Sequence, residues 1–157
     1  MISEELEARM KVLEDIEAIR KLRAHYCYNV DAERLEELLS LFTEDARLDF
    51  GLLGTHEGKE AVSKFFRDIV AGILSYSRHM VHNPIIEVDG DKATGRWYFE
   101  VPCTLRGTDM AVWLAGTYEE KYVKERGEWK FSFIKATFDY ATPYEEGWAK
   151  TPFFNIA

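Results

Sequence analysis

The sequence predicts an α+β fold: an antiparallel sheet that curves into a cone and, with three N-terminal and inter-strand helices, encloses a pocket. Apolar residues near the N-terminus recur at steps of three and four, which is typical of amphipathic helices. The second half consists of four long strand-forming runs separated by Gly-containing turns. Helices beside such a meander make an α+β architecture, and a strongly curved sheet leaves a hollow core.

The first predicted helix runs from about Ser3 to Asn29. Its apolar stripe should face inward and ends at Tyr26; it consists of Leu6, Met10, Leu13, Ile16, Ile19, Leu22 and Tyr26. A short second helix is predicted over 32–39, and short strands over 46–50 and 55–57. A third helix is predicted from Lys59 to about Ile73, with a buried face of Val62, Phe65, Phe66, Ile69, Val70 and Ile73.

The four long strands are predicted over 77–88, 92–105, 109–125 and 128–142. Alternation places one apolar set inside the sheet, namely Trp97, Phe99, Val101 and Cys103. The odd positions of Trp129–Phe133 are expected to be buried as well. An exposed sheet face with Tyr98, Trp113 or Tyr118 would need cover, so we expect a homo-oligomer, either a trimer or a dimer.

Length and composition limit the possible functions. The 157 residues fit one domain, 1–157, with 144–157 as a C-terminal tail that either closes the pocket as a lid or docks on a neighbouring subunit. A net charge of -8 disfavours nucleic acid and membrane partners. Two cysteines, no signal-peptide pattern and no membrane span indicate a cytoplasmic protein. Neither a phosphate loop nor a dinucleotide fingerprint is present, and no cofactor or metal is expected.

Asp31 and His79 are the strongest catalytic candidates. If the pattern folds as predicted, they meet in the pocket, where the carboxylate would fix the tautomer of the imidazole and stabilise its cation. Tyr26 would donate a hydrogen bond to a ligand. Each has a structural alternative: Asp31 as the N-cap of the second helix, His79 as an ordinary strand residue, and Tyr26 as a core aromatic. His82 has the opposite strand parity and is expected to be structural.

The expected substrate contacts are side chains on or near the predicted pocket. They are Trp97, Phe99, Val101, Cys103, Trp113, Phe138 and Tyr140, although aromatic residues at such spacings also fill ordinary cores. Cys103 has no basic neighbour that would lower its pKa, so nucleophilic catalysis by this thiol is not expected.

The element order resembles that of the SnoaL-like branch of the nuclear transport factor 2-like superfamily. The resemblance rests on Val30-Asp31 after the first helix, Gly116-Thr117-Tyr118 on a late strand and Gly127–Phe131 on the last hairpin. Within this branch the chain is similar to hexachlorocyclohexane dehydrochlorinase, bile-acid 7α-dehydratase and scytalone dehydratase. The resemblance implies the cone-shaped fold and an Asp–His dyad at Asp31 and His79.

Four positions depart from these enzymes. Tyr26 and Ile134 stand where the dehydrochlorinase has a lysine and an arginine, which argues against the same substrate. Val101 and Cys103 stand where the two dehydratases carry a further aspartate or histidine.

The sequence therefore predicts a cofactor-independent lyase of the dehydratase type, or an isomerase. His79 would act as the base on a small, apolar, cyclic or oxygenated substrate. The alternatives are a non-catalytic protein that binds a small molecule or a partner subunit, like a dioxygenase β subunit, and a polyketide-cyclase-like enzyme.

Overall fold

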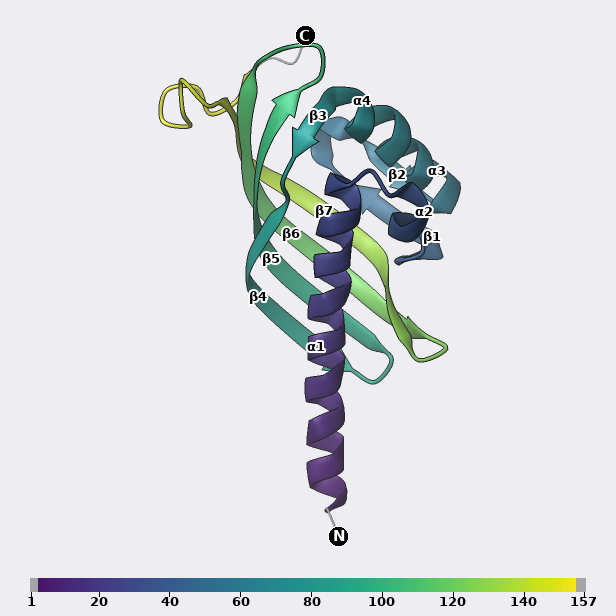
Figure 1. The fold of residues 1–157 in the computed structure, drawn as a ribbon. Coiled ribbons are helices and arrows are strands. Elements are labelled where there is room, and N and C mark those ends of the chain that lie inside the picture. The colour runs from purple at the N-terminus through teal and green to yellow at the C-terminus, as the bar shows by residue number, and fades with distance from the viewer. Residues whose placement is uncertain (1–2, 155–157) are drawn as a thin grey trace.

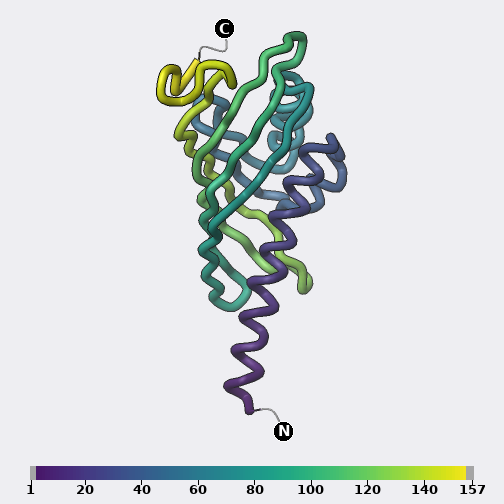
Figure 2. Tube along the Cα trace, turned by 60° about the vertical axis from the view of Figure 1, so that its left-hand side comes forward, coloured from purple at the N-terminus to yellow at the C-terminus, as the bar shows by residue number. Residues whose placement is uncertain are grey.

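A curved sheet packed against one long helix organises the molecule (Figures 1 and 2). The structure is a computed structural model and describes residues 3–154. The helical elements are α1 (Glu4–Asp31), α2 (Leu35–Leu39), the 3-10 helix η1 (Gly51–Leu53), α3 (Lys59–Lys64), the π-helix η2 (Phe65–Val70) and α4 (Ala71–Ile73). The strands are β1 (Phe42–Asp49), β2 (Thr55–Glu57), β3 (Leu74–Ser77), β4 (Met80–Asp89), β5 (Lys92–Leu105), β6 (Ala111–Glu125) and β7 (Glu128–Pro143). The α+β prediction is confirmed.

The sheet is mostly the predicted antiparallel meander. Strands β4 to β7 pair with their neighbours in sequence, and the order of the main path is β2-β1-β7-β6-β5-β3. One pairing was not anticipated: β1 runs parallel to β7, with Leu48 opposite Ile134. The first strand of the chain is thereby paired with the last one.

The third predicted helix spans the expected residues but is not a single α-helix. Its central segment, Phe65–Val70, is a π-helix between α3 and α4. Val62, Phe65 and Phe66 are buried as predicted. Such wider turns are common near functional sites, and this one contributes to the cavity described below.

The first half of α1 projects beyond the sheet (Figure 1). Ile19, Leu22 and Tyr26 are buried as predicted, but Leu6, Met10 and Leu13 are exposed, Leu13 at 65%. The prediction of a continuous buried stripe is wrong for these three residues, because the helix is longer than the sheet it packs on. Periodicity reports which residues share a face, and it does not report where the neighbouring element ends.

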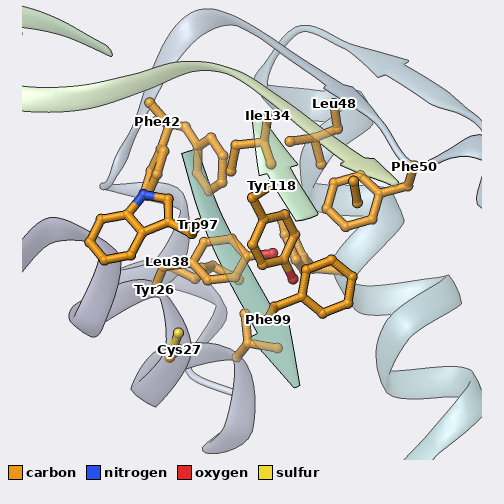
Figure 3. Close-up of a cluster of buried hydrophobic side chains, with 14 of the residues drawn as sticks. Tyr26, Cys27, Leu38, Phe42, Leu48, Phe50, Trp97, Phe99, Tyr118 and Ile134 are labelled. Atoms are coloured by element: carbon orange, nitrogen blue, oxygen red, sulfur yellow. The ribbon is translucent and has the colours of Figure 1, made fainter. Parts of the chain in front are cut away.

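The side chains of the core come from α1, from the helical segment 59–73 (α3, η2 and α4) and from the face of the sheet that packs on these helices (Figure 3). Trp97, Phe99, Val101 and Cys103 are all buried, as their alternation predicts. The alternation in β7 changes phase after Phe131, since a register shift against β6 leaves Ser132 as an extra residue. Phe133 is therefore only half-buried, contrary to prediction, whereas Ile134 is fully buried.

Gly116 allows β6 to approach β7 closely. A Cβ atom at this position would lie 2.0 Å from the Thr137 carbonyl oxygen and 2.8 Å from the Phe99 ring. We expect Gly116→Ala to lower the free energy of unfolding by about 1–3 kcal/mol or more, as overpacking does. Urea denaturation measures the change. Gly72→Ala is the matched control: it lies in α4 with no atom within 4 Å of the added Cβ, so it should be neutral or slightly stabilising. Equal destabilisation by both variants would contradict this interpretation.

Candidate active site

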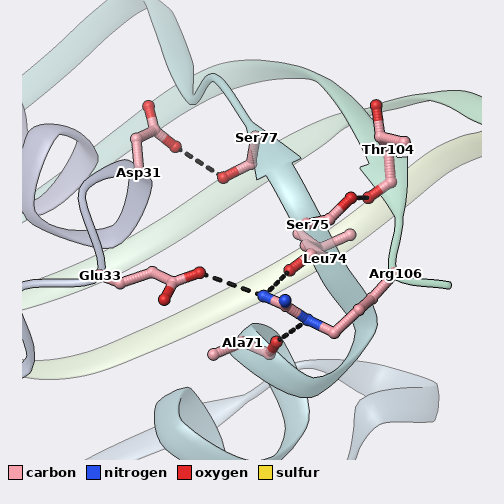
Figure 4. Close-up of polar contacts among 8 residues, drawn as sticks. All are labelled: Asp31, Glu33, Ala71, Leu74, Ser75, Ser77, Thr104 and Arg106. Atoms are coloured by element: carbon pink, nitrogen blue, oxygen red, sulfur yellow. Dashed lines mark hydrogen bonds and ion pairs between the residues drawn. The ribbon is translucent and has the colours of Figure 1, made fainter.

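Asp31 and His79 meet where the end of α1 reaches the turn between β3 and β4. The Nδ1 atom of His79 lies 2.6 Å from Oδ1 of Asp31, and the His79 backbone amide donates to Oδ2 at 2.8 Å. The Ser77 hydroxyl donates to Oδ1 at 2.9 Å (Figure 4). Three donors from one segment therefore converge on a single carboxylate.

The N-cap alternative for Asp31 is not what the structure shows. Asp31 is the last residue of α1, and α2 begins after Arg34 without a side-chain cap. A carboxylate at a helix C-terminus faces the negative end of the helix dipole, which is unfavourable. The donors of Ser77 and His79 offset that cost, so the position of Asp31 depends on the β3–β4 turn.

The chain leaves the sheet at His79 because of Pro102 on the neighbouring strand. The Arg78 amide donates to the Pro102 carbonyl at 3.1 Å, but proline has no amide hydrogen to return. The backbone hydrogen bonds to β5 are therefore interrupted between Ser77 and Met80. The backbone amide of His79 donates to Asp31 instead. The prediction that His79 lies within a continuous strand is therefore wrong: the strand is broken between Ser77 and Met80. This break brings the His79 ring to the Asp31 carboxylate.

Arg106 holds the neighbouring segments together beside the dyad (Figure 4). Its guanidinium donates to the carbonyls of Ala71 and Leu74 at 2.8 and 2.7 Å and to the Glu33 carboxylate at 3.2 Å. The α1–α2 connection and the start of β3 are thereby linked through one side chain. Asp31 directly precedes the first of these segments and His79 follows the strand that begins in the second, so this contact supports their relative placement.

Asp31 is ionised in this arrangement. Burial alone would raise its pKa, but the hydrogen bonds and charge of His79, with the Ser77 hydroxyl, outweigh burial and hold the pKa below its ordinary value. With Nδ1 of His79 engaged by the carboxylate, Nε2 is the ring nitrogen left to act on a ligand.

His79 lines an apolar cavity of about 440 Å³ between the sheet and the helical segment. Such a volume is within the usual range for small-molecule sites. Most of the wall is aliphatic or aromatic, including Ile69 and Val70 of the π-helix. The exceptions, side chains with a polar group, are Asp49, His79, Cys103, Tyr118, Lys135 and Thr137.

The structure separates the predicted substrate contacts into two groups. Phe99, Val101, Cys103 and Phe138 line the cavity with His79. Trp97, Trp113 and Tyr140 are not among the lining residues. Trp97 is buried elsewhere in the core and donates its indole N–H to the Tyr122 hydroxyl at 3.0 Å.

Trp113 and Tyr140 pack against the C-terminal tail instead. Both rings are nearly parallel to Trp148, with centroid separations of 6.3 Å for Trp113 and 5.1 Å for Tyr140. Trp113 lies out of phase with its lining neighbours Val112 and Leu114 on β6. The prediction of a cavity position for these two aromatics is therefore corrected.

The tail also reaches the cavity. The Ala141 amide donates to the Pro152 carbonyl at 2.8 Å, and Phe153 and Phe154 are among the lining residues. The described part of the tail therefore docks on its own β7; residues 155–157 of the predicted tail lie outside the described residues. Its action as a lid stays a prediction.

Tyr26 lies behind the dyad rather than on the cavity wall. It is 1% exposed, and its ring meets that of His79 edge to face at a centroid distance of 6.4 Å. His82 forms a contact of 3.2 Å with Glu100 and does not line the cavity.

Sequence reasoning missed Tyr118, which was expected on an exposed face. It is 3% exposed and lines the cavity. The sequence did contain an indication of this. Glu119 and Lys121 are charged and point to the face of β6 opposite to Tyr118, which predicts that Tyr118 faces inward. Glu120, a charged residue in phase with Tyr118, obscured that signal.

Residues 3–154 contain neither a candidate metal site nor a candidate membrane-spanning helix. No group of three or more His, Cys, Asp or Glu side chains there is arranged to hold a metal ion. No helix in that range combines the length and the apolar character needed to cross a membrane.

Comparisons with known proteins agree with this architecture. Two related sequences are an uncharacterised protein of Mycobacterium tuberculosis, 29% identical over 71% of this chain and 77% of its own length, and the γ-hexachlorocyclohexane dehydrochlorinase of Sphingobium indicum, 25% identical over 80% and 81%.

Two solved structures are similar at 25% identity. A hexachlorocyclohexane dehydrochlorinase from Novosphingobium barchaimii has a TM-score of 0.80 and covers 86% of this chain and 93% of its own. A scytalone dehydratase-like protein from Novosphingobium aromaticivorans has a TM-score of 0.78, with 84% and 89% covered. The SnoaL-like domain model matches residues 11–135. With this match over most of its length, the chain belongs to the SnoaL-like family of the nuclear transport factor 2-like superfamily.

Proposed function

We propose that this protein is a cofactor-independent lyase of the dehydratase type, or an isomerase, acting on a small, apolar, cyclic or oxygenated molecule. The observation that carries the proposal is the 2.6 Å contact between His79 Nδ1 and Asp31, with the same imidazole on an apolar cavity. A general base needs a held ring, a fixed tautomer and access to a substrate proton. The contact with Asp31 and the place of His79 on the cavity wall support these three requirements.

In the proposed reaction, His79 Nε2 accepts a proton from a substrate carbon. Asp31 holds the ring through Nδ1 and stabilises the imidazolium that forms. Tyr26 supports the His79 ring through their edge-to-face contact, and a hydrogen bond to the substrate falls to a donor on the cavity wall. The apolar lining excludes water, which strengthens each of these interactions.

The relatives support a lyase, and the departures favour a dehydratase over a dehydrochlorinase. Dehydrochlorination and dehydration both begin with loss of a proton from carbon. Tyr26 and Ile134 stand where the resemblance places a lysine and an arginine in the dehydrochlorinase, so the site lacks those cations for a departing chloride. The ammonium group that does line the cavity, Lys135, lies 3.7 Å from Glu119, so a group that leaves as neutral water fits this site better than chloride.

Deuterium exchange tests proton abstraction without knowledge of the natural substrate. The probe is α-tetralone, a bicyclic ketone with an acidic C–H next to its carbonyl, incubated with the protein in D2O and followed by mass spectrometry. The proposal predicts exchange well above buffer, and dehydration of the corresponding β-hydroxy ketone to α-naphthol. Binding of α-tetralone without exchange or dehydration would instead support the alternative of a non-catalytic binding protein.

The expected homo-oligomer stays a prediction, to which the structure adds candidate surfaces. Exposed apolar side chains occur on the projecting part of α1, at Leu6, Met10 and Leu13, and on β5 at Tyr98. Covering such groups is a common reason for self-association. We expect light scattering at micromolar concentration to give the mass of a dimer or a trimer. A monomer mass across that range would contradict the expectation.

A further inference from the structure

A single guanidinium group is buried between two tyrosine rings behind the cavity. Arg23 of α1 is fully buried, and its Cζ atom lies 4.1 Å from the ring centroid of Tyr26 and 3.9 Å from that of Tyr118. Both distances are within the range of cation–π interactions. One charge therefore contacts the faces of two phenol rings at once.

Glu120 provides the counter-charge. Its Oε1 atom lies 3.3 Å from Arg23 Nη1, and neither side chain is exposed. The other carboxylate oxygen accepts from the Tyr122 hydroxyl, which in turn accepts from the Trp97 indole. Among the described residues, no guanidinium nitrogen of Arg23 has a hydrogen-bond partner of good geometry.

Stability alone does not explain such a pair. Desolvation of two buried charges commonly cancels their attraction, and apolar replacements of similar size are often equally stable. The missing hydrogen bonds of the guanidinium make the balance less favourable still. The location of the charge therefore suggests a role in the site.

That location is directly behind the candidate active site. Tyr118 lines the same cavity as His79, and the Tyr26 ring contacts the His79 ring. In Figure 3 the labelled rings of Tyr26 and Tyr118 lie next to each other, with their hydroxyl ends directed to the same region. The pair of phenols thus connects the buried charge with the base.

We propose that Tyr118 is a substrate-binding hydrogen-bond donor for a carbonyl oxygen, and that Arg23, held by Glu120, is the positioning residue that orients and polarises it. This inference rests on the proposed function and names its substrate class: a cyclic carbonyl compound with a leaving hydroxyl at the β carbon.

The reaction balances with these groups. His79 Nε2 takes the proton from the carbon next to the carbonyl, and the C–H electron pair moves to the carbonyl oxygen as an enolate. The electrons then return to form the C=C bond and break the β C–O bond, and the imidazolium proton leaves with the hydroxyl as water. Negative charge develops on the carbonyl oxygen, where a donor polarised by a cation stabilises it most.

The Cys103 thiol, which also lines the cavity, is less suited to this role. Burial raises the pKa of the Cys103 thiol to about 12, and its Sγ contacts the Val112 carbonyl at 3.6 Å. Burial also raises the pKa of Tyr118, while the charge of Arg23 acts in the opposite direction. Tyr118 is therefore a protonated phenol next to a permanent cation, which makes it the stronger donor.

The carbonyl stretching frequency of bound α-tetralone, labelled with carbon-13 at the carbonyl, reports directly on the proposed hydrogen bond. Hydrogen bonding lowers this frequency relative to the free ketone. We expect Tyr118→Phe to shift the bound band to higher frequency and to weaken binding by about 2–10-fold, the usual effect of one hydrogen bond. Tyr98→Phe, an exposed tyrosine on β5, is the matched control and should change neither reading.

A second arm tests Arg23 without leaving a charge unpaired. The double variant Arg23→Met with Glu120→Gln removes both charges and keeps side chains of similar size. At saturating ketone, we expect the carbonyl band of the ketone bound to this double variant to move toward the frequency of the free ketone. Adding Tyr118→Phe to the double variant should then shift the band little further. A purely structural role would lower stability and leave the band in place.

Three results would overturn the inference: no binding of α-tetralone at millimolar concentration, a band unaffected by Tyr118→Phe, or a band unaffected by the double variant. His79→Ala keeps this test separate from the proposed function. It should lower the exchange rate by about 10²–10⁴-fold and leave the carbonyl band of the bound ketone unchanged. An unchanged exchange rate together with an unchanged band would count against His79 as the base and leave the assignment of Tyr118 in place.

Discussion

His79→Ala is expected to lower the rate of deuterium exchange into α-tetralone by about 10²–10⁴-fold, the range that a positioned general base supplies. The other titratable groups on the cavity wall are engaged elsewhere or are poor bases: Asp49 accepts from the Gly51 amide at 3.3 Å, Lys135 lies 3.7 Å from Glu119, and burial raises the pKa of the Cys103 thiol. The measurement is the initial exchange rate at saturating ketone. Because alanine removes the ring and leaves the apolar wall, affinity for the ketone should change little.

Two further variants make the His79 result specific. His82→Ala removes a histidine that is three residues away, half-exposed and next to Glu100, and the exchange rate should stay as in the wild type. Asp31→Asn keeps the shape of the acceptor but removes the charge that stabilises the imidazolium, so a lower rate is expected. Full exchange activity in His79→Ala would exclude the proposed base.

The dyad also predicts how stability depends on pH. The pKa of Asp31 is lowered in the folded state, so its contribution is complete above the ordinary carboxyl pKa and is lost as pH falls through the lowered value. Asp31→Asn should therefore flatten the acid side of the stability curve.

Arg23→Met is expected to be the most destabilising single substitution, at about 3–5 kcal/mol of unfolding free energy. It leaves the Glu120 carboxylate buried without its cation. Urea denaturation of the single variant and of the Arg23→Met, Glu120→Gln double variant measures the effect. The double variant should recover most of the loss, because neither charge then remains in the core.

The pH dependence of this deficit has a defined sign. Burial raises the pKa of Glu120, and Arg23 opposes that rise. Without Arg23 the folded-state pKa rises further, so the stability of Arg23→Met is highest at acidic pH and falls as pH rises through that value. A single variant as stable as the double variant at neutral pH would contradict the account of a buried, mutually dependent pair.

Much of the site follows from local pattern. The apolar period placed Tyr26 inside, alternation placed Phe99, Val101 and Cys103 inside, and the resemblance joined Asp31 to His79; the structure has all of these arrangements. These features depend on the phase of one element or on a motif, both of which the sequence carries directly.

The errors concern relations between elements. The parallel pairing of β1 with β7, the end of the sheet halfway along α1, and the strand break opposite Pro102 each depend on how distant segments meet. Tyr118 was misplaced because Glu120 shares its phase, and a buried glutamate is intelligible only once Arg23 is seen beside it. Trp113 and Tyr140 were misplaced because their partner, Trp148, lies in an irregular tail.

The pairing of β1 with β7 has a consequence for how the protein is made. Phe42 and Phe131 are partners roughly ninety residues apart, a separation that slows folding because the intervening loop must close first. On a ribosome, Asp31 and His79 emerge well before the strands that wall the cavity. The nascent chain therefore holds both members of its dyad before it has an enclosed space for them, and the site matures only when the last strand is released.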